Sequence, residues 1–295
     1  MPIWMAFLTL TFIWGSTPLA IQWSQQGTGH SFAVTARIAI GVMLFVLLIP
    51  VLKRRPVTFR QLNVISVIAG LNLFGSMILL YWGARFLPSG WISVLFGLGP
   101  MLTGLMAAFW LREPFTRDHL LGSLLGFAGL LVIFAHADTA GEQTPLGVGL
   151  VILSVCVASA GNVAIKRWSR DISPLWVAAG SLWVAFPLFL VVFLTSGDPW
   201  PGTVTLRSGL AIVYLGVVAN GVGFVCFYYL LSRVSAANAF LVTLTAPAVA
   251  LWLGAVFNQE VIQEGLLLGT ILILVGLALF QWGIPWKIRS RRESV

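Results

Sequence analysis

Ten apolar runs of 18 to 24 residues follow one another along this chain of 295 residues, each bounded by proline, glycine or charge. A helix rising about 1.5 Å per residue needs about 20 such residues to cross a bilayer. The runs are continuous rather than alternating, which excludes the strands of a membrane barrel. Only 9% of the residues are charged, against roughly a quarter in soluble domains. We therefore predict an all-α integral membrane protein with ten transmembrane helices, at residues 3–24, 31–52, 62–84, 89–111, 120–137, 146–165, 174–195, 208–231, 236–257 and 265–282.

An internal repeat organises these runs. Residues 81–130 match residues 228–277 at ten of fifty positions without a gap, always 147 residues apart. The matches include Tyr81 with Tyr228, Pro100 with Pro247 and Glu113 with Glu260. This predicts two five-helix repeats, residues 1–138 and 139–286, followed by a basic tail at 287–295. Because five is odd, the second repeat is inverted relative to the first, which is the usual basis of alternating access in transporters.

The placement of the basic residues predicts the orientation. If the amino terminus is cytoplasmic, fourteen of the seventeen lysines and arginines fall in cytoplasmic segments, Arg85 and Arg207 fall outside, and Arg37 lies within a span. By the positive-inside rule, both termini then face the cytoplasm. The net charge of +8 is explained by this asymmetry, and no nucleic-acid partner is expected.

Metal, cofactor and enzyme chemistry find no support in the sequence. The three histidines are far apart, at positions 30, 119 and 136, and Cys156 and Cys226 lie within spans without a partner motif. No paired carboxylates, histidine cluster or nucleophile with a base occurs at membrane depth. We expect no cofactor and no catalytic residue.

Arg37 is the one ionised side chain well inside a predicted span, and an intramembrane arginine is a functional candidate by default. It lies six residues after Ser31, about 9 Å from the span boundary. One hypothesis is that Arg37 binds a substrate carboxylate. The alternative is structural, either snorkelling to the interface or bonding between helices.

Pro100 and Pro247 each fall in the middle of a predicted span. A proline inside a helix leaves the carbonyl one turn earlier without its donor, here at Phe96 and Thr243. Such carbonyls must face the bundle or a watery cavity rather than lipid. The kinks are therefore predicted either to line the substrate site or to shape helix packing.

Polar side chains at mid-depth either line a cavity or bond across helices. Four such residues of the predicted spans are placed in the substrate site: Asn72, Ser76, Asn162 and Asn220. Ser159 lies on the same helix face as Asn162. Trp14 lies beside Gly15, Ser16 and Pro18 and is a pocket candidate for an apolar or cationic part of a substrate.

Tyr81 and Tyr228 are predicted at opposite mouths of the two repeats, where they could act as gates. The alternative is that they are ordinary aromatic-belt residues at the membrane interface. Pairs of glycines four apart, Gly122 with Gly126 and Gly265 with Gly269, allow close helix contact. That contact is expected within the chain, with a homodimer interface as the alternative.

Several ordered motifs resemble the EamA family of drug/metabolite transporters. They are WGSTPLAIQ from Trp14, YWGARFLPSG from Tyr81 with its counterpart YYLLSRVSAANAF, then LGPMLTGLMAAFWLREPF and LTAPAVALWLGAVFNQE, followed by LGSLLGFAGL and LGTILILVGL. The resemblance covers nearly the whole chain and implies a ten-helix carrier of the bacterial inner membrane, commonly an exporter of amino acids or other small metabolites. One departure is SAGNVAIK in the sixth span, where relatives often carry an aromatic residue.

The leading functional hypothesis is a secondary transporter of small amino acids or related polar metabolites, because inverted halves and an interior with one arginine suit a zwitterion. The alternatives are an exporter of lipophilic or cationic drugs and, less favoured, a membrane-embedded lipid enzyme. Glu113 and Glu260 lie at span ends, where we expect them to cap loops or orient helices. Without a buried carboxylate at mid-depth, uniport is favoured over exchange through a central glutamate.

Overall fold

Leucine, isoleucine, valine and phenylalanine fill the long runs of this chain, and the regular structure of its described residues is entirely helical. The structure is a computed structural model that describes residues 1–52, 59–87, 92, 95–134, 144–169, 172–198, 200–246, 249 and 265–282. Its helices are α1 (Ile3–Gln25), α2 (His30–Leu52), α3 (Phe59–Gly83), α5 (Gly99–Leu111), α6 (Arg117–Phe134), α7 (Thr144–Trp168), α8 (Pro174–Thr195), α9 (Leu206–Tyr214), the π-helix η1 (Leu215–Gly223), α10 (Phe224–Arg233), α11 (Ala236–Phe240) and α13 (Gly265–Trp282).

Six helical segments of the described residues are long and apolar enough to cross a membrane. They are Ile3–Gln25, His30–Leu48, Gln61–Gly83, Pro145–Trp168, Pro174–Thr195 and the continuous segment Leu206–Arg233. Shorter apolar helices occupy Gly99–Leu111, Ala236–Ala246 and Ile271–Phe280. Two predicted spans, 174–195 and 265–282, have the same bounds as α8 and α13.

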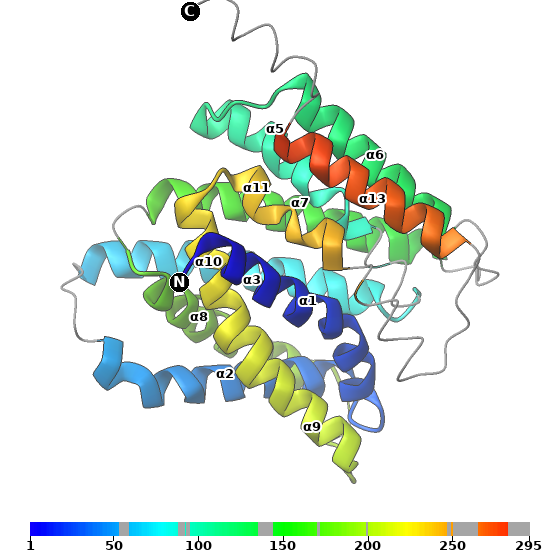
Figure 1. Cartoon of the computed structure of the whole chain (residues 1–295). Coiled ribbons are helices and arrows are strands. Elements are labelled where there is room, and N and C mark those ends of the chain that lie inside the picture. Colours follow the sequence, from blue (N-terminus) through cyan, green and yellow to red (C-terminus); the bar gives the residue numbers. More distant parts are fainter. Residues whose placement is uncertain are drawn as a thin grey trace, which may run out of the picture.

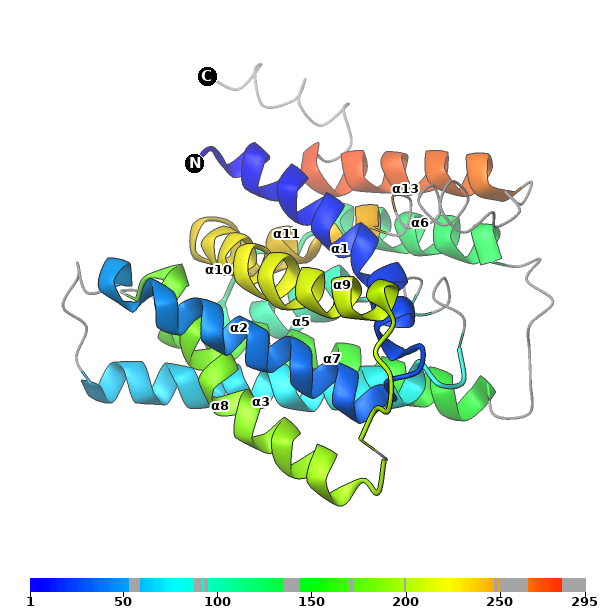
Figure 2. The same ribbon diagram turned by 90° about the horizontal axis from the view of Figure 1, so that it is seen from below.

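The helices form a bundle with α6 and α13 side by side along one edge (Figures 1 and 2). Inside the bundle, α3 packs on α7 and α8, while α2 packs on α8 and η1. Helix α1 crosses the segment made of α9, η1 and α10, and α5 lies against α7 and α11. Elements of the first half therefore pack mainly on elements of the second half.

Glycines allow the closest of these contacts. A Cβ atom at Gly122 of α6 would lie 2.6 Å from the carbonyl oxygen of Gly276 in α13, and one at Gly129 would lie 2.6 Å from that of Gly269. Two backbones can approach this closely only where no side chain intervenes. A Cβ atom at Gly126 would meet the Leu244 side chain at 3.3 Å. Packing within the chain is thus confirmed for the predicted pair of Gly122 and Gly126.

The fourth predicted span is interrupted, which corrects the interpretation of Pro100. Helix α5 begins at Gly99, so Pro100 stands in its first turn, whereas a proline in the middle of a helix was predicted. The first amide groups of a helix have no intrahelical acceptor, so Pro100 costs no hydrogen bond there. Pro247 lies outside the described residues.

A second difference lies in the eighth span, which is helical over residues 206–233 but is a π-helix at Leu215–Gly223. The hydrophobic pattern does not distinguish a π turn from an α turn, because both keep the backbone bonded within the segment. Such turns occur frequently at functional sites.

At one end of the bundle, an ion pair ties three parts of the chain together. The Glu113 Oε1 atom lies 2.6 Å from Lys166 Nζ, and Glu113 Oε2 accepts a 2.8 Å hydrogen bond from the Ala236 amide at the start of α11. The Lys166 ammonium also donates to the Val234 carbonyl. The predicted capping role of Glu113 is confirmed, and Glu260 lies outside the described residues.

Candidate functional site

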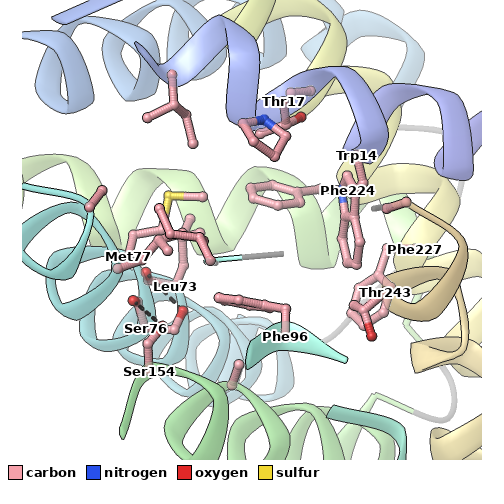
Figure 3. Close-up of a pocket in the computed structure, with 18 of the residues that line it drawn as sticks. Trp14, Thr17, Leu73, Ser76, Met77, Phe96, Ser154, Phe224, Phe227 and Thr243 are labelled. Atoms are coloured by element: carbon pink, nitrogen blue, oxygen red, sulfur yellow. Dashed lines mark hydrogen bonds between the residues drawn. The ribbon is translucent and has the colours of Figure 1, made fainter. Parts of the chain in front are cut away.

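A cavity of about 200 Å³ lies between the two halves of the bundle. Its lining comes mainly from α1, α3, α7 and α10, with single residues from α2, η1 and α11. Residues between α3 and α5 and after α11 complete it, among them Phe96 and Thr243. Figure 3 shows that polar side chains of α3 and α7 lie on one side of the cavity and aromatic side chains of α1 and α10 on another. The cavity therefore offers two chemically different walls to one ligand.

The polar wall is built by Asn72, Ser76, Ser154 and Asn162. Ser154 donates a 2.7 Å bond to the Ser76 carbonyl, and the Asn72 amide donates a 3.4 Å bond to Asn162 Oδ1. The Oδ1 atom of Asn72 is buried and has no protein partner among the described residues. The two hypotheses for these residues are thus compatible, since they bond between α3 and α7 and also line the cavity.

The aromatic wall combines Trp14 with Phe227 and Phe240. The ring centroids of Trp14 and Phe227 are 5.1 Å apart, and those of Phe227 and Phe240 are 6.1 Å apart. Phe96 and Phe224 also line the cavity. Aromatic rings at these distances form a cohesive apolar surface. This wall suits an apolar group of a ligand.

Arg37 lines the cavity from α2, and its side chain is 1% exposed. Its Nη1 donates a 3.1 Å bond to the Tyr81 hydroxyl, and its Nη2 donates a 2.6 Å bond to Asn220 Oδ1. The snorkelling alternative is wrong, because the guanidinium turns into the bundle. Within the described residues no carboxylate lies within 4 Å of it, and its Nε atom has no hydrogen-bond partner.

Tyr81 and Tyr228 are buried within the bundle, at 1% and 6% exposure. The aromatic-belt alternative is therefore wrong for both, since belt residues face the interface. Tyr81 holds Arg37, whereas Tyr228 lines the cavity beside Phe227. Their role as gates stays a prediction.

The structure brings most of the predicted site residues together. Trp14, Arg37, Asn72, Ser76, Phe96, Asn162, Tyr228 and Thr243 line the cavity. Asn220 and Tyr81 accept hydrogen bonds from Arg37 and do not line the cavity themselves. Pro100 is buried in the first turn of α5 and is not among the lining residues.

Sequence reasoning missed Gln22, Ser154 and the phenylalanines at 224, 227 and 240. The spacing of Ser154 and Asn162 by two helical turns was the available signal for Ser154. Nothing in the local sequence distinguishes Phe227 and Phe240 from phenylalanines that face lipid, because an apolar side chain suits either surroundings.

The comparisons with known proteins agree with this architecture. The model of the EamA-like transporter family matches the chain twice, over residues 1–135 and 145–282. The chain belongs to the EamA-like transporter family. This EamA-like chain is a multi-pass membrane protein and a transporter, and it is not an enzyme.

Relatives of this EamA-like protein align over nearly its whole length. A protein of Streptantibioticus cattleyicolor named "Probable terminal-alkyne amino-acid exporter" is 28% identical over 278 residues, covering 94% of this chain and 92% of the relative. "Uncharacterized transporter YoaV" of Bacillus subtilis is 25% identical over 281 residues, covering 93% and 95%. A crystal structure with 22% sequence identity has the same fold, with a TM-score of 0.78 over 99% of this chain and 98% of that chain.

Proposed function

We propose that this protein is a secondary transporter that exports small amino acids or related polar metabolites by alternating access. In this proposal its ten transmembrane helices form two inverted five-helix repeats in the bacterial inner membrane, with both termini in the cytoplasm. The uneven distribution of basic residues supports that orientation. The named amino-acid exporter among the relatives supports the substrate class.

The helix contacts support the inverted repeat. When each element of the first half is exchanged for its predicted counterpart in the second, the contact of α3 with α7 becomes that of the α9 to α10 segment with α1. The contact of α3 with α8 likewise becomes that of η1 with α2. The pairs α6 with α13 and α5 with α11 each join one predicted repeat element to its own counterpart. The double match of the family model agrees with this division.

The observation that most supports amino acids as substrates is the buried charge of Arg37 at a cavity with an aromatic wall. A buried cation is costly unless an anion or several hydrogen bonds compensate it. Arg37 has two neutral partners among the described residues, and its Nε atom has none. A substrate carboxylate would supply the missing charge, while an apolar side chain of the substrate would lie against Trp14 and Phe227.

Lipophilic drugs are the second candidate, and the aromatic wall is the observation that favours them. A cationic drug would meet the positive charge of Arg37 in a medium of low dielectric, which is unfavourable. Among the described residues, the cavity lining includes no aspartate or glutamate that could offset that repulsion. The same lack of a carboxylate among the lining residues supports uniport over proton exchange through a central acid.

Counterflow in proteoliposomes tests the proposal. Vesicles loaded with a mixture of amino acids should accumulate the labelled amino acid that the protein accepts, whereas vesicles loaded with cationic dyes should not. Arg37→Lys keeps the positive charge but cannot bond Tyr81 and Asn220 in the same geometry, so it should lower uptake. Arg37→Gln removes the charge and should lower uptake further. Normal uptake by both variants at normal expression would refute the role of Arg37. Accumulation of dyes alone would favour the second candidate.

A further inference from the structure

Asn220 is fully buried in η1, and both ends of its amide contact the same residue. Its Oδ1 atom accepts the 2.6 Å bond from Arg37 Nη2, and its Nδ2 atom donates a 3.1 Å bond to the Arg37 carbonyl oxygen. A side chain whose amide oxygen and nitrogen are both bound by one partner has little freedom to turn elsewhere. Asn220 does not line the cavity itself, so it acts on a ligand only through Arg37.

Glycines bring α2 and η1 close enough for this double contact. A Cβ atom at Gly216 would lie 3.0 Å from the Arg37 carbonyl oxygen, and one at Gly41 would lie 3.3 Å from the Asn220 Cβ atom. The contacts fall on the π-helical part of the eighth span, whose wider turns change which side chains face α2. The backbone is thus shaped around the pair of Arg37 and Asn220.

The partners of Arg37 in the bundle share one property, which is that they are neutral. Tyr81 offers a hydroxyl oxygen and Asn220 an amide oxygen. An aspartate in place of Asn220 would have nearly the same shape and would form a stronger, charge-assisted bond to the guanidinium, although it would lose the bond that Asn220 donates to the Arg37 carbonyl oxygen. Such a carboxylate would also cancel the positive charge before any substrate arrived.

We propose that Asn220 is a positioning residue that holds Arg37 in place without neutralising it, so that the guanidinium stays available to a carboxylate in the cavity. Tyr81 assists as the second neutral partner. Two of the five N–H groups of the guanidinium are bonded to these residues, and the Nε–H group is among those without a partner in the described part of the chain, so the guanidinium keeps donors for a carboxylate oxygen. This inference rests on the proposed function, because it takes an amino acid as the ligand.

The test compares two probes, L-leucine and L-leucinamide, which differ in whether a carboxylate is present. Their binding to the full-length protein in detergent is measured for the wild type, Asn220→Asp, Asn220→Leu and Tyr81→Phe. The matched control is Asn63→Asp, the same chemical change at an exposed position of α3. Thermal unfolding of each variant without a probe separates effects on the fold from effects on binding.

Asn220→Asp is expected to unfold near the wild-type temperature, because the stronger bond to the guanidinium offsets the lost bond to the Arg37 carbonyl oxygen. It should nevertheless bind L-leucine at least about tenfold more weakly, because its own carboxylate occupies the guanidinium. Tyr81→Phe should weaken binding severalfold, and Asn63→Asp should leave it unchanged. Asn220→Leu should lower both the unfolding temperature and the affinity, since it strands Arg37 Nη2 without an acceptor.

If Asn220 had a purely structural role, the affinity for L-leucine would follow the stability of each variant. The well-folded Asn220→Asp would then bind L-leucine like the wild type. That result would overturn the inference and leave the proposed function standing. If the wild type bound L-leucinamide as tightly as L-leucine, or bound no amino acid of the counterflow mixture, carboxylate recognition itself would fail. The proposed function and the inference would then fall together.

Discussion

Replacement of Gly161 by alanine should disturb the polar wall of the cavity. Gly161 lies in α7 opposite Asn72 of α3, next to Asn162. A Cβ atom at Gly161 would lie 2.6 Å from the Asn72 Cβ atom, against 3.4 Å for ordinary contact, and would also meet the Asn72 amide. Rotation of the side chain cannot move its Cβ atom. The two helices must therefore separate by about 0.8 Å, as close-packed interiors resist overlap.

Over-packing of this kind costs about 1–3 kcal/mol, and the change from glycine to alanine within a helix stabilises it by about 0.5–1 kcal/mol. The midpoints of these two ranges differ by about 1.2 kcal/mol, so we expect Gly161→Ala to lower the free energy of unfolding by about that amount. Separation of the helices would also break the 3.4 Å bond between Asn72 and Asn162, so the apparent KM for the transported amino acid should rise.

Gly149→Ala is the matched control, because Gly149 lies in the same helix and the methyl carbon of an alanine there would have no atom within 4 Å. This variant should keep the wild-type KM and unfold at the same or a higher temperature. Both variants are measured by thermal unfolding in detergent and by counterflow at several substrate concentrations. If Gly161→Ala matched Gly149→Ala in both assays, the packing argument for the polar wall would be refuted.

Two further predictions concern the end of the bundle that carries Glu113. Glu113→Ala removes both the ion pair with Lys166 and the acceptor of the Ala236 amide, and should lower the free energy of unfolding by about 1–3 kcal/mol. Glu113→Gln keeps an acceptor for the amide and should cost less. Equal losses of the two variants in thermal unfolding would contradict the capping role. Burial lowers the pKa of His119 below 6.5, with Asp118 partly opposing the shift, and His119 Nδ1 accepts a bond from the Thr116 amide. A lowered pKa means that the folded protein favours the neutral ring. The contribution of His119 to the free energy of unfolding is therefore fully present above pH 6.5 and is lost as the pH falls below it. The unfolding temperature of His119→Gln should therefore depend less on pH between 7 and about 5 than that of the wild type, and an unchanged pH profile would refute this.

Much of the fold could be predicted from the sequence, because the bilayer sets a fixed length for each apolar run. The bounds of α8 and α13 equal those of the predicted spans, and the two matches of the family model fall in the two predicted halves. Eight of the predicted site residues line one cavity, since a polar or charged side chain in a long apolar run has few tolerable surroundings other than a cavity or a helix contact.

The rest depended on contacts between distant parts of the chain. The burial of Tyr81 and Tyr228 was not predicted, because an amphipathic ring near a span end is compatible with either the interface or the bundle. The start of α5 at Gly99 was not predicted, since an apolar run with a proline reads the same whether the helix bends there or begins there.

The sequence by itself determined that this protein crosses a membrane repeatedly and that Arg37 lies at depth, because hydrophobic length and charge are properties of local segments measured against a bilayer of fixed thickness. Only the tertiary structure decided what surrounds that charge. The neutral partners of Arg37 come from positions 44 and 183 residues away in the chain, and the aromatic wall comes from α1, α10 and α11. Which side chains meet at such separations follows from how whole helices pack, and no local pattern encodes it.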